Sequence, residues 1–253
     1  TMKIKPFKAI RPTKDKVHLV ASRAYYTYEK QVLDAKLEAN PYTFMHIINP
    51  EFNSKDKTYP NSIERFNKVR KRYEKFCQDN IFMQDITASF YIYRQTFGDY
   101  SFTGLIAGAS VDEYNEGKIK KHEATITTRE SLFVDYLDCV GFNAEPVLLS
   151  YEKNDSIATL IANKIKQEPE YDFSTTDGNK HELWVCNSNE LIADIQSQFE
   201  KINEVYIADG HHRSASSARL AEKKRKENPN FTGDENFNSF LAYFISEDEM
   251  KIY

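Results

Sequence analysis

The sequence predicts an α+β fold, in which helices pack against mixed sheets. Short strand-like runs of β-branched and aromatic residues alternate with segments whose apolar residues recur at helical spacing. Hydrophobic residues make up 40% of the 253 residues and charged residues 28%, which is typical of a folded globular chain. No apolar run approaches the roughly 20 residues that a membrane-spanning helix needs. We therefore expect a globular protein without a membrane partner.

The first fifty residues predict an extended segment, a helix and a strand. Residues 3–20 contain Pro6 and Pro12, which disfavour a helix and leave the chain extended. Residues 22–38 predict a helix that ends before the next proline. The apolar run 43–48 predicts a strand, and a polar loop follows it.

The clearest helix covers residues 60–80. Its apolar residues recur at steps of three and four and share one face: Ile63, Phe66, Val69, Tyr73 and Phe76. The other face is basic: Lys68, Arg70, Lys71, Arg72 and Lys75. We interpret this basic face as solvated, and a nucleic-acid surface is the alternative. The net charge of −4 argues against a general polyanion binder.

The middle of the chain predicts a hairpin followed by a helix. Residues 87–95 and 100–109 flank the turn Phe-Gly-Asp, so they predict a β-hairpin. After a short polar segment, Thr127 and Glu130 resemble a capping box, in which the threonine begins a helix and the glutamate bonds back to it. The helix is expected over residues 129–140 and ends at a glycine.

The second half continues the alternation of strands and helices. Residues 146–151 predict a strand, and 155–167 predict an amphipathic helix. A hairpin around an Asp-Gly turn is expected over residues 171–186. Residues 189–202 predict a further amphipathic helix, and 239–246 predict a buried strand.

The stretch of most chemical interest lies between these last two elements. A short strand at residues 205–208 leads into a polar turn, and a helix rich in small residues starts near residue 211. The turn and the residue after it are Asp209, Gly210, His211, His212, Arg213 and Ser214. Because the first backbone N–H groups of a helix lack partners within the helix, this corner predicts an anion-binding site.

Each residue type of the turn suits a phosphate ligand. Gly210 permits positive φ and a close approach of ligand to backbone. Arg213 offers a planar fork that binds phosphate bidentately. His211 and His212 titrate near neutrality, and Asp209 could cap the helix, orient a histidine or hold a metal ion. We favour an anion cradle over a metal site, and the alternative is an ordinary strand–helix turn with exposed histidines.

A second candidate group is His122 with Glu123, in the sequence Lys-His-Glu-Ala-Thr. A carboxylate beside a histidine could activate a hydroxyl for phosphoryl transfer or hold Mg²⁺. The zinc motif H-E-x-x-H is excluded because Ile126 stands where its second histidine would be. The alternative is a surface pair before a helix. In the functional interpretation, His122 and Glu123 share one pocket with the turn and face Arg213.

Both motifs resemble those of one known family. The order Ile-Lys-Lys-His-Glu-Ala-Thr, Glu-Pro-Val-Leu-Leu-Ser-Tyr and Ile-Ala-Asp-Gly-His-His-Arg, after an Ile-Arg-Pro start, resembles the bacterial and archaeal domain-of-unknown-function family 1015. The resemblance covers nearly the whole chain. One departure is Ser-Arg-Ala-Tyr-Tyr-Thr-Tyr-Glu, where many relatives have a proline-rich stretch. Membership implies no established activity.

More distantly, the turn resembles the phosphate-binding G-x-x-R turn of the ParB/sulfiredoxin-like superfamily, which includes partition proteins, sulfiredoxins and free-serine kinases. The resemblance implies a ParB/sulfiredoxin-like element around the turn. It also implies a bound nucleotide, ATP or ADP with or without Mg²⁺, held by residues 209–214. Sulfiredoxin chemistry needs a cysteine where this turn has a histidine, so that reaction is disfavoured.

Three functions follow as hypotheses. The first is a nucleotide-dependent phosphotransferase acting on a small hydroxylated metabolite, serine-like by resemblance, with Glu123 as base or metal ligand and His122 and His212 as further catalytic candidates. The second is a non-catalytic nucleotide-binding regulatory protein, and the third is a phosphoester hydrolase that uses the histidines. Nucleic-acid binding is disfavoured, because the sequence shows no basic helix-turn-helix pattern and the net charge is negative.

For organisation, we expect an N-terminal α/β part at 1–150 and a second part at 151–253 that carries the turn. The chain stops inside a strand-like segment, Met-Lys-Ile-Tyr, so we expect the native protein to continue beyond it. The three cysteines match no metal-ligand spacing: Cys77, Cys139 and Cys186. They are typical of reduced thiols in a cytoplasmic protein.

Overall fold

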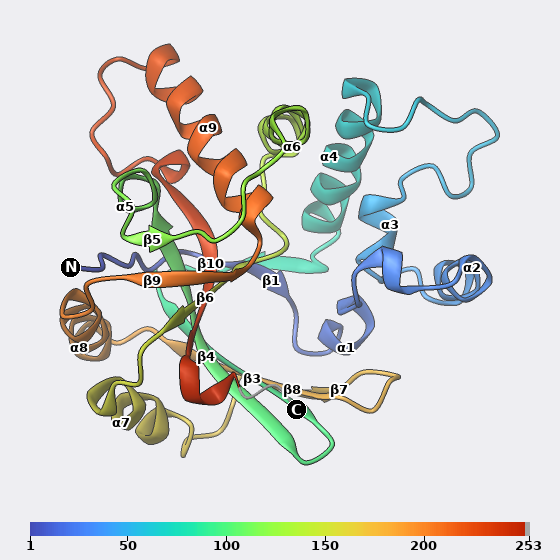
Figure 1. The fold of residues 1–253 in the computed structure, drawn as a ribbon. Helices are drawn as coiled ribbons and strands as arrows, with labels where there is room; N and C mark the ends of the chain where they lie inside the picture. The colour runs from blue at the N-terminus through green and yellow to red at the C-terminus, as the bar shows by residue number, and fades with distance from the viewer. Residues whose placement is uncertain (251–253) are drawn as a thin grey trace.

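A computed structural model describes residues 1–250, and it confirms the α+β fold. Within these residues, eight strands form one large mixed sheet and two form a small antiparallel sheet (Figure 1). In spatial order the large sheet contains β5 (Ile119–Lys120), β9 (Val205–Asp209), β6 (Val147–Tyr151), β10 (Ser239–Ser246), β4 (Tyr100–Ser110), β3 (Phe90–Phe97), β8 (Lys180–Cys186) and β7 (Tyr171–Ser174). The small sheet pairs β1 (Ile10–Pro12) with β2 (Phe82–Gln84).

The helices lie in two groups around the large sheet (Figure 1). One group consists of α5 (Val111–Asn115), α7 (Asp155–Lys164), α8 (Asn189–Glu200) and α9 (His211–Glu227). The other consists of α1 (Val17–Val20), α2 (Lys30–Ala39), α3 (Met45–Ile48) and α4 (Ile63–Gln78), and α6 (Thr127–Val140) contacts both α4 and α9. Short 3₁₀ turns complete the described fold: η1 (residues 25–27), η2 (Asn236–Asn238) and η3 (Glu247–Glu249).

Two apolar clusters hold these layers together. The larger one joins one face of the sheet to the first group of helices, and it includes Phe90, Trp184, Phe199 and Phe244. Along β8, every second residue is buried, as expected for a strand that covers a core on one face. The second cluster lies between α4, α3 and α6 and contains Phe66, Val69 and Phe76, the face predicted from helical spacing.

Most of the predicted elements are confirmed. The hairpin of β3 and β4 pairs Arg94 with Thr103 and turns at Gly98, whose φ is +59°. The second hairpin, β7 with β8, turns at Gly178 with φ +83°. Helix α6 ends at Gly141 in the left-handed conformation. Strands from both sides of residue 150 share the large sheet, and β6 itself spans that position.

Residues 43–48 form no strand, contrary to the prediction. The chain there turns into α3, and the Thr43 hydroxyl accepts the Met45 N–H at 3.3 Å, which starts the turn. A short apolar run cannot be distinguished by periodicity between a strand and a buried helical turn. Here Ile47 enters the second apolar cluster, where α4 covers it.

Three further expectations need correction. The extended segment 3–20 contains a helical turn, α1, after its second proline. The polar segment before residue 121 contains α5 and β5. The capping box is wrong, because α6 begins without a side-chain cap, and Glu130 accepts a hydrogen bond from Thr125 instead of pairing with Thr127. The terminal strand-like segment lies almost entirely outside the described residues.

Among residues 1–250, no helix combines the length and the hydropathy that crossing a bilayer requires.

Candidate functional site at the start of α9

The predicted turn joins the end of β9 to α9 (Figure 1). Gly210 is the N-cap of α9 and has φ +99°, so the backbone enters the helix through a left-handed residue. A Cβ atom at this position would lie 3.0 Å from Nη2 of Arg213. The turn therefore favours glycine because of its φ angle, and an added Cβ would also push the Arg213 guanidinium that folds back over it. No side chain caps the helix here, so its first N–H groups receive no side-chain acceptor.

Small residues explain how α9 holds this corner in place. Ala215, Ala218 and Ala221 join the main apolar cluster beneath the helix, and Ala221 is fully buried. The Ser214 hydroxyl donates to the carbonyls of Gly210 and His211, at 3.1 and 3.0 Å. Because Ser214 is fully buried, its side chain closes the first turn and is not directed to a ligand.

His211 is the residue that brings the two predicted motifs together. Its ring lies 4.5 Å from the ring of His122, centroid to centroid, in an edge-to-face arrangement. Its Nε2 accepts a long hydrogen bond, 3.4 Å, from the His122 backbone N–H. Its Nδ1 lies 3.7 Å from Oε2 of Glu123. His122 and His211 are 89 positions apart, so only the tertiary fold brings them together.

The environment of His211 favours the neutral imidazole. The residue is only 7% exposed. Burial is the main cause that lowers its pKa below 6.5, and His122 and His212 lower it further. Glu123 and Asp209 act in the opposite direction but do not reverse the shift. Since Nε2 accepts a hydrogen bond, the ring proton lies on Nδ1 and faces the Glu123 carboxylate.

Arg213 does not contact His122 or Glu123, the residues that were expected to face it. Its Nη1 contacts Oε2 of Glu145 at 3.3 Å, and its Nη2 contacts Oδ2 of Asp209 and the carbonyl of Pro146, both at 3.2 Å. Its Nε is buried without a hydrogen-bond partner. The two motifs thus meet through His211, and Arg213 lies against the segment that precedes β6.

His212 points toward α6. Its ring centroid lies 6.5 Å from that of Phe133, and its Nε2 is buried without a hydrogen-bond partner. A buried, unpaired nitrogen is costly unless something outside the protein satisfies it. Together with Nε of Arg213, it gives the first turn of α9 two unsatisfied donors or acceptors.

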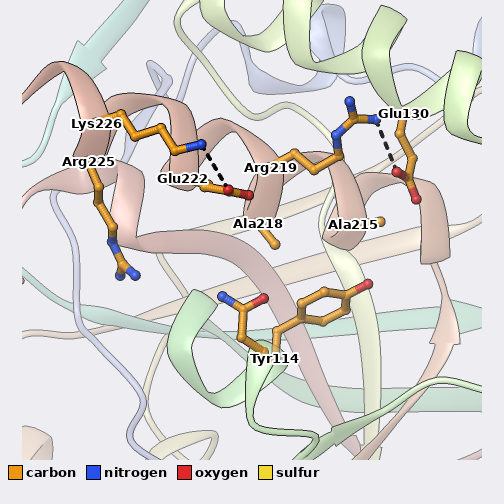
Figure 2. Close-up of a pocket in the computed structure, with 9 residues that line it drawn as sticks. Tyr114, Glu130, Ala215, Ala218, Arg219, Glu222, Arg225 and Lys226 are labelled. Atoms are coloured by element: carbon orange, nitrogen blue, oxygen red, sulfur yellow. Dashed lines mark hydrogen bonds and ion pairs between the residues drawn. The ribbon is translucent and has the colours of Figure 1, made fainter.

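Sequence reasoning missed Glu145, and it gave Glu130 a different partner from those found here. Glu145 fixes Arg213, and Glu130 receives both Thr125 and Arg219. The bond from Arg219 to Glu130 is 3.1 Å and ties α9 to the start of α6 (Figure 2). No local pattern marks the pairs of Arg213 with Glu145 and of Arg219 with Glu130, because their members are 68 and 89 positions apart. Within the described part of the chain, no cluster of three or more His, Cys, Asp or Glu side chains has the geometry of a metal site.

Comparison with known families now places the chain. The family described as "Protein of unknown function (DUF1015)" matches residues 4–253. The chain belongs to this family. No curated protein and no solved structure matches it. In this member of the DUF1015 family, the match includes both the residue 121–125 motif and the turn at 209–213. The ParB/sulfiredoxin-like resemblance is not found by these comparisons.

Proposed function

We propose that this protein binds a nucleotide, ATP or ADP, through a phosphate at the start of α9, and transfers a phosphoryl group to a small hydroxylated metabolite. The observation that supports the proposal is the meeting of His122 and Glu123 with His211 at the uncapped end of a 17-residue helix. A long helix directs its free N–H groups and the positive end of its dipole at a bound anion.

The phosphate would lie near the backbone at Gly210, beside the Arg213 guanidinium that folds back over this glycine. Arg213 and the His212 ring supply positive charge and hydrogen-bonding capacity beside it. In the protein alone, Asp209 and Glu145 occupy the Arg213 guanidinium. A phosphate that competes with these two carboxylates would gain a fork that is already oriented. A bound phosphate would have to displace Asp209 and Glu145 from Arg213, so these two carboxylates oppose binding until the arginine turns to the ligand.

Glu123 is the candidate base. Its side chain is 62% exposed and lies beside the proposed phosphate site, so an incoming hydroxyl can reach it. In the proposed step, the acceptor oxygen bonds to the terminal phosphorus as the bridging P–O bond breaks. The hydroxyl proton passes to Glu123, and the nucleotide leaves one phosphate shorter. His211, neutral and within 3.7 Å, orients the carboxylate.

The first experiment separates binding from transfer. Calorimetric titration with ATP and with ADP, in Mg²⁺ buffer, should show binding to the wild-type protein that Arg213→Ala abolishes. Unchanged nucleotide affinity in a folded Arg213→Ala variant would overturn the proposal. Lys223→Ala, on the same helix but engaged with Asp138, is the matched control and should bind normally.

The second experiment tests the reaction. After incubation with nucleotide and a panel of hydroxylated metabolites, mass spectrometry should detect a phosphorylated product for the wild type. Glu123→Gln should bind nucleotide and form no product. Nucleotide binding without any product would instead indicate a regulatory protein. Free phosphate with a dephosphorylated metabolite would indicate a hydrolase.

A further inference from the structure

The Arg213 side chain folds back over the start of α9. A Cβ atom on Gly210 would lie 3.0 to 3.3 Å from three guanidinium atoms, Nη2, Cζ and Nε. The flat group therefore lies over the N-cap glycine, close to the first N–H groups of the helix. A phosphate near this backbone would lie beside a guanidinium whose own N–H groups are directed at other acceptors.

Three acceptors hold the guanidinium in this position. Nη2 contacts Oδ2 of Asp209 and the carbonyl of Pro146, both at 3.2 Å, and Nη1 contacts Oε2 of Glu145 at 3.3 Å. Among residues 1–250, Glu145 is the only partner of Nη1, and Arg213 is the only partner of the Glu145 carboxylate. The contact between Arg213 and Glu145 therefore decides whether Nη1 is available to a ligand.

This closed arrangement of Arg213 is weak. The side chains of Glu145 and Asp209 are 57% and 74% exposed, and ion pairs in contact with water contribute little to stability. Nε of Arg213 is buried without a hydrogen-bond partner, which raises the free energy of the closed position. A phosphate dianion offers more charge and more acceptor atoms than either carboxylate, so it can replace both.

A second arginine of α9 forms a different kind of pair. Arg219 bonds to Glu130 at 3.1 Å, and the Glu130 side chain is only 15% exposed (Figure 2). Glu130 also accepts a hydrogen bond from Thr125, whereas Glu145 has one donor and is open to water. The Arg219 pair is therefore a fixed connection between α9 and α6, and the Arg213 pair can open without exposing a buried charge.

The position of Glu145 in the chain allows this opening. It lies in the segment between Gly141, at the end of α6, and the first residue of β6. Residues 143–145 are exposed and form neither helix nor strand. The carboxylate can therefore withdraw from Arg213 without disturbing a packed element.

We propose that Glu145 is an autoinhibitory residue, which holds the Arg213 guanidinium away from the ligand until a phosphate takes its place on Nη1. The inference rests on the proposed function, because it concerns the same phosphate site. Glu145 thereby sets the affinity of the site without contacting the ligand. Any event that removes its carboxylate from Arg213 increases that affinity.

Two variants of Glu145 test this switch by calorimetric titration with ADP. Glu145→Gln removes the charge, and Glu145→Asp keeps the charge on a side chain one methylene shorter, which withdraws it from Nη1. Both should bind ADP roughly 1.5- to 5-fold more tightly than the wild type, the effect of losing one exposed ion pair. Asp135→Asn, at an exposed position of α6, is the matched control and should leave affinity unchanged. Tighter binding by Glu145→Gln alone would indicate a general effect of charge and overturn the proposal.

Chemical modification gives a second measurement that needs no nucleotide. Phenylglyoxal reacts with guanidinium groups, and peptide mapping by mass spectrometry gives the rate at each arginine. The rate at Arg213 should rise in both Glu145 variants, while the rate at Arg219, whose partner is intact, should not change. An unchanged rate at Arg213 would overturn the switch.

The ADP titrations also distinguish failure of the switch from failure of the phosphate site. Equal ADP affinity in the wild type and in both Glu145 variants would overturn the switch and leave the phosphate site standing. Absence of ADP binding in all three proteins would overturn the phosphate site, and the switch with it.

Discussion

The starts of α4 and α9 are built in opposite ways. At α4, the Ser62 hydroxyl caps the helix by accepting the Arg65 N–H at 3.2 Å, and Glu51 lies beside it, 2% exposed. Glu51 accepts hydrogen bonds from Thr58, Arg65 and Lys68. At α9, a glycine replaces the cap, and the nearby carboxylate of Glu123 is 62% exposed with a single long contact to His211.

The difference distinguishes Glu51, whose carboxylate is satisfied by groups of the protein, from Glu123, whose carboxylate is accessible to a ligand. Every hydrogen-bond donor to Glu51 lies within 17 positions of it along the chain, so the hydrogen bonds of this carboxylate are satisfied locally. At α9, Arg213 and His211 contact groups that are 68 and 89 positions away along the chain. Two buried nitrogens, Nε2 of His212 and Nε of Arg213, have no hydrogen-bond partner. Polar groups left unsatisfied by a folded chain are candidates for contact with a ligand. We therefore propose a ligand site at α9 and not at α4, although each helix carries six Lys or Arg residues.

The largest effect is expected from Glu51→Gln. The substitution leaves Arg65 and Lys68 without their buried carboxylate, so the protein should lose more thermal stability than in any variant below, while nucleotide affinity stays unchanged. Thermal unfolding with parallel nucleotide titration measures both. Glu38→Gln, on the exposed face of α2, is the control. Loss of nucleotide binding in Glu51→Gln would contradict a purely structural role for Glu51 at the start of α4.

The same variant predicts a pH dependence. The bonds from Lys68 and the Thr58 N–H lower the pKa of Glu51 to about 2, against roughly 4.3 in an unfolded chain. The stabilisation is therefore complete above about pH 4.3 and is lost as the pH falls through 2. The stability gap between wild type and Glu51→Gln should narrow over that window. A gap that stays constant down to pH 2 would contradict this account of Glu51.

The next effect is expected from Gly210→Ala. The positive φ and the close Arg213 guanidinium should cost about 1–3 kcal/mol of unfolding free energy, and displacement of Arg213 should weaken nucleotide binding. Gly178→Ala is the matched control, since its φ is also positive, at +83°, but no atom lies within 4 Å of its added Cβ. Urea unfolding should show the larger loss at Gly210. Equal losses would mean that the Arg213 contact contributes nothing.

A smaller effect is expected from Ser62→Ala. Removal of the cap of α4 should cost about 1 kcal/mol of unfolding free energy without any change in nucleotide affinity. Ser156→Ala, at an exposed non-cap position in the first turn of α7, should change stability by less than about 0.5 kcal/mol. Equal values for the two variants would show that the Ser62 cap is unimportant.

The smallest effect is expected from protonation of His211. Burial, then His122, lowers its pKa in the folded protein, so its contribution to stability is present above the unfolded value of about 6.5 and is lost as the pH falls toward the folded pKa. Between pH 7 and 5.5, the wild type should lose more unfolding free energy than His211→Gln. The exposed His18→Gln should follow the wild type. Parallel curves for wild type and His211→Gln would contradict the buried, neutral histidine.

Local patterns in the sequence predicted most elements. The spacing of Phe66, Val69 and Phe76 defined the buried face of α4, and the Asp-Gly turn defined the second hairpin. The prediction failed where a pattern was too short, as at residues 43–48, or where a side chain had two candidate partners. Glu130 is the second case, because Thr125, five positions before it, donates to its carboxylate in place of Thr127, and Arg219 of α9 bonds to the same carboxylate.

The sequence by itself determined the backbone of the candidate site: a strand, a glycine that can adopt positive φ, and a helix whose alanines allow close packing. These features depend on residue type and spacing over a few positions, where conformational preference acts directly. Only the tertiary structure decided the partners. It placed His122 and Glu123 against His211 and turned Arg213 toward Glu145. Such contacts depend on how distant elements pack, and a local pattern carries no information about that packing.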